Sequence, residues 1–316
     1  MQEYRHCCLC PRNCGVDRLS GVKGVCGENS LLRIGTASIH RGEEPPVTGL
    51  GGSGTVFITG CNLGCGLCQN YQVSQEEMGK VVSREEFADI CLRLQEKGAE
   101  NINIVTGSHA VPAITAGFKY ARSKGLKIPA LWNSSGYESL SALSLLDEVI
   151  DVYLPDLKSL DKKIGEKFFN AVDYPEHAEK AIKFMMKSRR LKFKNVQGID
   201  ILLSGVIIRH LILPDHLEST KNVIRWFAEN CQGQGRALLS LMTQYTPLRQ
   251  AEINRYLNER EYEQVLKWLD EFGIDDGFYQ ELILDSSWLP DFNRTNPFSS
   301  ELSTPVWHWH KGMIFI

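Results

Sequence analysis

The chain has 316 residues, of which 43% are hydrophobic and 23% are charged. This composition is typical of a folded globular protein with a large core and excludes a disordered chain. The formal net charge of -3 excludes a large basic surface, so we expect no nucleic-acid partner. No stretch approaches the roughly 18 uninterrupted apolar residues of a membrane helix, and the first residues lack the apolar part of a signal peptide. We therefore expect a cytoplasmic protein with no membrane partner.

The first unit predicted from the sequence, residues 1–50, is rich in cysteine. Five of the ten cysteines lie in the first 26 residues, and in a reducing cytoplasm clustered thiols usually bind metal rather than form disulfides. Four of them have a spacing suited to one metal centre, with Cys8 left over: Cys7, Cys10, Cys14 and Cys26. Four thiolates can complete a tetrahedral zinc site or a second [4Fe–4S] cluster, and the sequence leaves both open.

Another cysteine group follows residues 55–59, the first of six apolar runs. Cys61, Cys65 and Cys68 have the spacing C-x3-C-x2-C. Three thiolates can hold three irons of a [4Fe–4S] cluster and leave the fourth iron open, whereas a structural zinc site takes four protein ligands. The pattern therefore indicates an iron–sulfur cluster with one free coordination position, where chemistry can take place.

The central part of the chain, residues 51–250, alternates strand and helix signals. Predicted helices include 83–97, which begins with a Ser83 and Glu86 capping box, and 112–124, which ends at Gly125. Parallel strands joined by helices form a parallel sheet, and six units predict a partial (β/α)6 barrel. The six predicted strands lie near residues 55–59, 102–106, 128–132, 149–154, 205–213 and 237–242.

The last unit, residues 251–316, breaks this rhythm. It contains one amphipathic helix near 259–272, followed by an irregular tail rich in Trp, Pro, Asn and Phe. The tail is too aromatic to be disordered, so we expect it to pack on the barrel or over its mouth. For residues 307–310, Trp-His-Trp-His, anchoring of the tail is favoured over contact with a substrate.

Polar residues follow the predicted strands, at the end where active sites of parallel βα barrels are built. Arg209 lies on the fifth strand, where its guanidinium can fork onto a carboxylate, and His210 beside it is expected to face the opposite way. The candidate cofactor-binding residues at these strand ends are Thr106, Gly107, Ser108, Asn133, Ser135, Asp156, Lys158 and Arg209.

The cysteine loop resembles the cluster motif of the radical S-adenosylmethionine (SAM) superfamily, with Leu67 where that family usually has an aromatic residue. The resemblance runs through roughly residues 7–250 and extends to the branch related to pyruvate formate-lyase activating enzymes. Its other stretches are residues 52–57, 68–71, 101–106, 153–158 and 208–214. It implies the radical SAM type of (β/α)6 fold, a [4Fe–4S] cluster on the three cysteines, and SAM chelated by the open iron.

The resemblance also implies an activity. It implies an enzyme that reductively cleaves SAM to a 5′-deoxyadenosyl radical and abstracts hydrogen, with a flavodoxin or ferredoxin as electron donor. The substrate it implies is a protein, a glycyl radical enzyme. A small molecule or a peptide is the alternative substrate. An alternative of another class is an iron–sulfur electron-transfer or metal-sensing protein, although a carrier would complete four-cysteine coordination of its cluster.

The resemblance assigns SAM contacts to the strand ends. Residues 106–108 take the place of a Gly-Gly-Glu-like stretch that holds the methionine ammonium, without its acid. Residues 133–136 match an Asp-Thr-Asn-Gly stretch with Asn in place of Asp, and residues 156–158 match an Asp-Leu-Lys stretch. Arg209 matches the arginine of the fifth strand that faces SAM.

Overall fold

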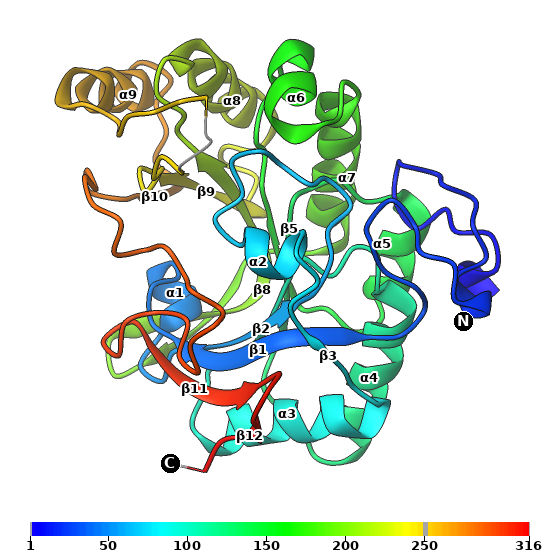
Figure 1. Cartoon of the computed structure of the whole chain (residues 1–316). Helices are drawn as coiled ribbons and strands as arrows, with labels where there is room; N and C mark the ends of the chain where they lie inside the picture. The colour runs from blue at the N-terminus through cyan, green and yellow to red at the C-terminus, as the bar shows by residue number, and fades with distance from the viewer. Residues whose placement is uncertain (1, 249–251, 316) are drawn as a thin grey trace.

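The computed structural model describes residues 2–248 and 252–315. Within these residues one curved sheet has the strand order β10-β9-β8-β6-β5-β4-β2-β1-β11-β12, with β3 paired to β1 and β7 paired to β8. Helices α3 to α9 follow the outer side of the sheet, and loops and the C-terminal segment occupy the other side (Figure 1). The two ends of this order do not pair with each other, so the barrel is open.

The middle of the sheet is parallel and contains the six strands predicted from the sequence. Parallel pairing joins β2 to β4, β4 to β5, β5 to β6, β6 to β8 and β8 to β9. These strands are β2 (Ser53–Ile58), β4 (Ile102–Val105), β5 (Ala130–Ser134), β6 (Val152–Pro155), β8 (Ile199–Leu211) and β9 (Ala237–Met242). The predicted partial (β/α)6 barrel is confirmed, and the buried apolar runs are those that a sheet covered on both faces requires.

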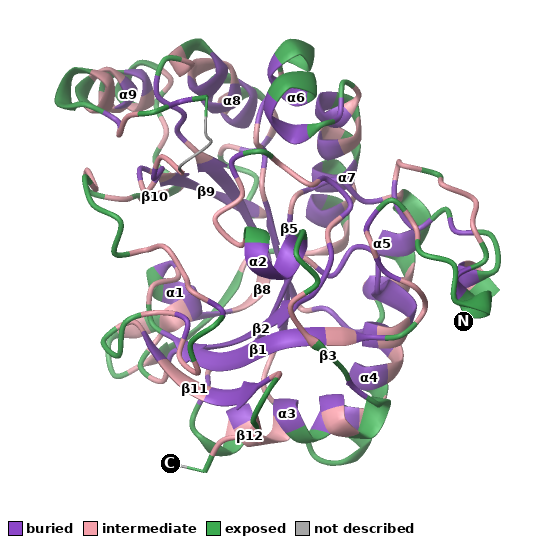
Figure 2. Cartoon of the chain, in the orientation of Figure 1, coloured by how far each residue is buried: buried purple, intermediate pink, exposed green. Residues whose placement is uncertain are grey.

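The outer helices each have a buried face (Figure 2), and α9 packs against α8. They are α3 (Arg84–Glu96), α4 (Val111–Ser123), α5 (Leu140–Leu146), α6 (Lys162–Phe169), α7 (Tyr174–Ser188), α8 (Leu217–Asn230) and α9 (Glu259–Glu271). The predicted capping box of α3 is present, because Ser83 Oγ accepts from Glu86 N at 3.1 Å and Glu86 Oε2 accepts from Ser83 N at 2.8 Å. Between α3 and α4, a Cβ added to Gly117 would lie 2.5 Å from the Phe87 ring, so a residue without a side chain permits this approach.

Both terminal segments supply strands, which corrects two expectations. We expected an irregular tail and assigned no strand to residues 1–50, but β1 (Arg33–His40) lies antiparallel between β2 and β11 (Ser303–His308). Trp307 and His308 are buried in β11 and anchor the tail. A short seventh parallel strand, β10 (Gly277–Tyr279), extends the sheet beyond β9.

The remaining elements are short. They are α1 (Pro45–Thr48), α2 (Tyr71–Ser74), β3 (Lys80–Val81), β7 (Lys192–Val196), β12 (Gly312–Met313) and two 3-10 turns (Gln2–Tyr4, Arg18–Ser20). None of the helices in the described parts of the chain is both long enough and apolar enough to cross a membrane.

Candidate functional site

The cysteine loop leaves the C-terminal end of β2 and lines a cavity of about 210 Å³ with all three of its cysteines, Cys61, Cys65 and Cys68. Burial raises the pKa of the Cys65 and Cys68 thiols, so these sulfurs are held as thiols unless a metal binds them. A Cβ added to Gly66, between them, would meet nothing within 4 Å, which leaves open space at the loop. A donor set of three thiols beside a cavity fits an iron–sulfur cluster with one iron left for another ligand.

Residues from other elements hold this loop in place. Arg12 donates through Nε to Asn62 O at 2.8 Å and through a terminal nitrogen to Leu63 O at 3.3 Å. From the other side, Asn170 Nδ2 donates to Gly64 O at 2.5 Å. The carbonyl groups of the loop are therefore satisfied by the N-terminal segment and by the end of α6, which fixes the loop backbone.

Five of the predicted cofactor-binding residues line the same cavity, at the C-terminal ends of β4, β5 and β6. They are Thr106, Asn133, Ser135, Asp156 and Lys158. The structure thus brings them beside the three cysteines, as expected for strand ends of one parallel sheet. Their contacts with SAM stay a prediction.

Asp156 and Lys158 form an ion pair in the wall of the cavity. Lys158 Nζ lies 2.5 Å from Asp156 Oδ2. Burial works to lower the pKa of Lys158, but the Asp156 carboxylate outweighs it and raises that pKa overall. The cavity therefore keeps a charged ammonium beside the cysteine loop, with donors suited to the carboxylate of a ligand.

Thr106 has a strained backbone at the edge of the cavity. Its φ of 63° is in the left-handed region, which a β-branched residue rarely adopts. Such a conformation costs about 1–3 kcal/mol and is found mainly at functional sites, where the surroundings enforce it. The Thr106 N–H donates to Asn133 O at 3.0 Å, which ties the ends of β4 and β5 together below the cavity.

The other three predicted residues lie outside this cavity. Gly107 packs against Ile114 and Trp132, within 3 Å of an added Cβ. Ser108 is buried and donates to Glu138 Oε1 at 2.6 Å. These contacts give both residues a packing role, and the SAM contacts expected of them stay predictions.

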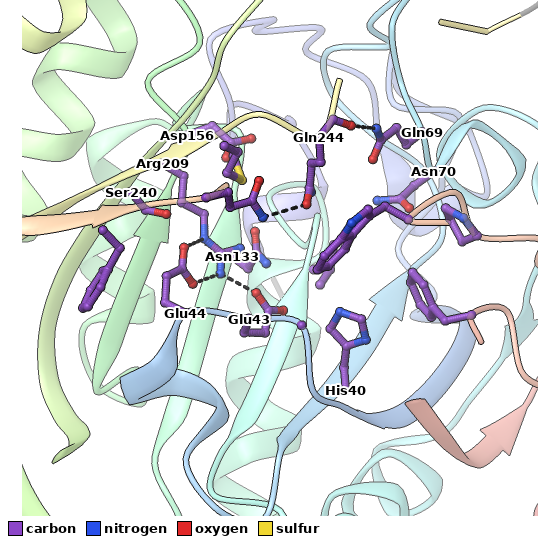
Figure 3. Close-up of a pocket in the computed structure, with 18 of the residues that line it drawn as sticks. His40, Glu43, Glu44, Gln69, Asn70, Asn133, Asp156, Arg209, Ser240 and Gln244 are labelled. Carbon is purple, nitrogen blue, oxygen red and sulfur yellow. Dashed lines mark hydrogen bonds and ion pairs between the residues drawn. The ribbon is translucent and has the colours of Figure 1, made fainter. Parts of the chain in front are cut away.

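Arg209 points into a neighbouring, larger cavity of about 530 Å³. Its Nε donates to Glu44 Oε1 at 2.8 Å, and a terminal nitrogen forms ion pairs with both Glu43 and Glu44 (Figure 3). Although burial disfavours the charge, Arg209 holds the pKa of Glu44 below its usual value. A fork from Arg209 onto a SAM carboxylate would have to replace these ion pairs. His210 faces the other way, as expected, and contacts Leu157 O at 2.7 Å.

The two cavities share a wall. Gln69, Asn70 and Gln244 line both of them, as do Asn133 and Asp156. Gln69 Nε2 donates to Gln244 O at 2.9 Å, so the cysteine loop and the end of β9 are joined where the cavities meet. A ligand in the larger cavity would therefore lie next to one at the cysteine loop.

No pattern in the sequence indicated Glu43 and Glu44 as site residues. Both lie in the short stretch between β1 and α1, away from the cysteines and from the ends of the six strands predicted from the sequence. Their ion pairs with Arg209 join positions 165 and 166 residues apart. A Glu-Glu pair followed by two prolines after an apolar run is the one local feature that could have drawn attention to them.

The N-terminal cysteines also gather around one place. Cys7, Cys10 and Cys26 are buried, and the Sγ atoms of Cys14 and Cys26 would lie 3.3 and 3.5 Å from a Cβ on Gly24. Burial raises the pKa of Cys10 to about 12. Burial also raises the pKa of Cys26, so the Cys10 and Cys26 sulfurs are held as thiols unless a metal binds them.

Arg18 stands beside this cysteine group with almost no exposure, 1%. Its guanidinium lies 3.7 Å from Cys7 Sγ and donates to His109 O at 2.6 Å. Within residues 2–248 and 252–315, no three or more His, Cys, Asp or Glu side chains are placed to hold one metal ion. Cysteines around a [4Fe–4S] cube each bind a different iron and need not converge on one point. Zinc and a second cluster both stay predictions.

Comparison with known proteins identifies the class. The Radical SAM superfamily matches residues 55–225, more than half of the chain, so this protein belongs to the radical SAM superfamily. An uncharacterized protein of Methanocaldococcus jannaschii is 28% identical over 284 residues, which cover 86% of this chain and 76% of that protein. The superfamily implies SAM and a [4Fe–4S] cluster, and the three-cysteine loop fits both.

Two solved structures resemble the fold. SuiB of Streptococcus suis bound to S-adenosylmethionine aligns with a TM-score of 0.50 and 14% identity over 70% of this chain. The alignment spans 48% of SuiB, so this chain matches about half of that protein's length. A domain of pyruvate-formate lyase-activating enzyme from Bacteroides vulgatus aligns with a TM-score of 0.39 and 14% identity, over 54% of this chain and 91% of that domain.

Proposed function

We propose that this chain is a radical SAM enzyme that abstracts hydrogen from a small molecule or a peptide segment held in the larger cavity. One observation carries the proposal. The three cysteines and five polar strand-end residues line one cavity, and that cavity shares its wall with a second cavity of about 530 Å³. Pockets of this size are typical of sites for small ligands.

In this proposal the loop cysteines hold the cluster, and the wall residues bind SAM. When bound, the cluster supplies the electron that cleaves SAM to methionine and a 5′-deoxyadenosyl radical, which removes hydrogen from a substrate. Lys158 can donate to the SAM carboxylate, and Asp156 can accept from its ammonium or ribose hydroxyls. Asn133 lines both cavities and can orient either ligand.

The C-terminal segment favours a small substrate over a folded partner. Trp288, Pro290 and Phe298 line the larger cavity, so the C-terminal segment forms part of its wall. For activation of a glycyl radical enzyme, an extended loop of that partner would have to pass these side chains. A small molecule or the end of a peptide meets no such requirement.

We propose a flavodoxin or ferredoxin as the electron donor, in the reducing conditions of the cytoplasm. Gly66, between two of the cysteines, is exposed, so the loop reaches the surface there. A donor protein that docks over this residue would lie close to a cluster on the loop. An electron carrier without SAM chemistry would have no use for the polar wall beside the cysteines.

The experiment is an anaerobic comparison of the wild type, a Cys61→Ala/Cys65→Ala/Cys68→Ala variant and a Cys91→Ala control. Cys91 is a buried thiol of α3, away from the loop, so its loss leaves the cluster site intact. Iron, sulfide and 5′-deoxyadenosine formed from SAM under reduction are measured in each. We expect 5′-deoxyadenosine from the wild type and Cys91→Ala and none from the triple variant. A wild type that carries a full cluster, forms none, and has a cluster spectrum unchanged by SAM would support the electron carrier instead.

A further inference from the structure

The larger cavity has an excess of negative charge. Arg209 is one cation between two carboxylates, Glu43 and Glu44, while Asp156 at the shared wall is paired with Lys158 (Figure 3). These five groups sum to one net negative charge. An anionic ligand would therefore face uncompensated carboxylates, whereas a cation would neutralise them.

Glu43 still has acceptor capacity. Asn103 Nδ2 donates to its Oε1 at 2.9 Å, and Arg209 pairs with its Oε2. A carboxylate offers about four lone-pair sites, so about two remain. The Glu43 side chain is 11% exposed, against 7% for Glu44, which leaves it open to a donor from the cavity.

His40 lies beside these carboxylates. It lines the cavity from the end of β1 and is 7% exposed. Burial lowers the pKa of His40, so the ring stays neutral and does not offset the carboxylates.

Aromatic rings form the opposite side of the cavity. The Phe298 ring lies 4.7 Å from the ring of His40 and 5.8 Å from that of Phe57, between centroids. Trp288 lines the same cavity from the C-terminal segment. Aromatic faces attract organic cations and bury the apolar part of a ligand.

We propose that the larger cavity binds its substrate through a protonated amine, with Glu43 as the acceptor and the aromatic wall around the alkyl chain. This inference rests on the proposed function in one respect, that the cavity is the substrate site. The ammonium group can belong to a free amine or amino acid, or to a lysine side chain of a peptide. A carboxylate or phosphate at this position is excluded by the charge balance.

The test is calorimetric titration of the anaerobic full chain with n-pentylamine, 1-pentanol and pentanoate, which share a chain and differ in charge. We expect the amine to bind at least tenfold more tightly than the alcohol, and pentanoate more weakly than both. Free lysine and the capped peptide acetyl-Ala-Lys-Ala-amide then distinguish the two sources, since the tighter ligand identifies the source. Equal binding of amine and alcohol, or tighter binding of pentanoate, would overturn the proposal.

Variants test whether Glu43 is responsible for the preference for the amine over the alcohol. Glu43→Gln removes one charge at constant shape and should weaken the amine at least tenfold while leaving the alcohol unaffected. Glu148→Gln is the control, because Glu148 pairs with Lys119 on the exposed helical side. If Glu43→Gln does not fold, Trp288→Leu serves instead and should weaken the amine more than the alcohol. An unchanged amine affinity in the folded variant contradicts the proposal.

Formation of 5′-deoxyadenosine by the wild type is scored separately from the titrations. A wild type that binds the amine but leaves SAM uncleaved refutes the proposed function and supports the charge preference of the cavity. A wild type that cleaves SAM but does not prefer the amine refutes the charge preference alone.

Discussion

Replacing Arg209 by methionine should destabilise the fold strongly, because it leaves two buried carboxylates without a cation. Arg209, Glu43 and Glu44 all have side chains between 7% and 11% exposed. Removing one partner of a buried ion pair costs about 3–5 kcal/mol, mainly through the charge left behind. With an unfolding entropy of about 2.1 cal/mol/K per residue, this chain would melt about 5–8 °C lower.

The stability lost in Arg209→Met should depend on pH, and the charges at the site determine the direction of that dependence. In the wild type, Arg209 holds the pKa of Glu44 below its usual 4.5, so this stabilisation is present above pH 4.5 and is lost as the pH falls. In Arg209→Met, burial and the neighbouring carboxylate raise both carboxyl pKa values above those of the unfolded chain. The variant therefore loses further stability as the pH rises, and its difference in melting temperature from the wild type should widen between pH 5 and pH 8.

Thermal unfolding followed by circular dichroism at pH 5, 6, 7 and 8 measures the difference in melting temperature between Arg209→Met and the wild type. The control is Arg209→Met with Glu43→Gln and Glu44→Gln, which removes the charges together and should recover most of the lost stability. A melting temperature of Arg209→Met within about 1 °C of the wild type at pH 8 would refute the reasoning. A gap that narrows with rising pH would refute the assigned charge states.

Three smaller changes test the scaffold of the site. Arg12→Ala removes the hydrogen bond to Asn62 O and should speed iron release from the anaerobic chain to a chelator several-fold. An unchanged rate of release would mean that Arg12 does not contribute to holding the cysteine loop in place. Gly117→Ala places a Cβ 2.5 Å from Phe87 and should lower the melting temperature by about 2–4 °C, and a rise would contradict the close packing of α3 and α4. Ser83→Ala removes the N-cap of α3, costs about 1 kcal/mol and should lower melting by about 1–2 °C, while Ser83→Asp should restore it.

Features that depend on neighbouring residues could be predicted from the sequence. The parallel strands were predicted because apolar, β-branched runs suit a sheet buried on both faces. The capping box of Ser83 and Glu86 and the spacing of the cysteines at 61–68 are local in the same way. The rule that parallel strands end at one edge of a sheet also predicted that the cysteines and the polar strand-end residues would line one cavity.

Features that depend on distant residues could not be predicted. β1 pairs with β11 through Thr36 and His308, and no periodicity in either segment indicates that partner. Arg209 was assigned to SAM because it matches the arginine of the fifth strand that faces SAM in the related enzymes, and that contact stays a prediction. The carboxylates that Arg209 pairs with in the structure, Glu43 and Glu44, come from a stretch outside the six βα units. A charged side chain can be predicted to need a partner, but its spacing does not show which one.

The two cysteine groups are parts of one packed structure. Cys61 N donates to Cys26 O at 3.3 Å, and Arg12, between the N-terminal cysteines, donates to the carbonyl of Asn62. Any metal that orders the N-terminal segment therefore also fixes the backbone of the loop that carries Cys61. This coupling gives residues 1–50 a physical role at the site. Ordering that segment reduces the freedom of a loop whose cysteines must converge on one cluster.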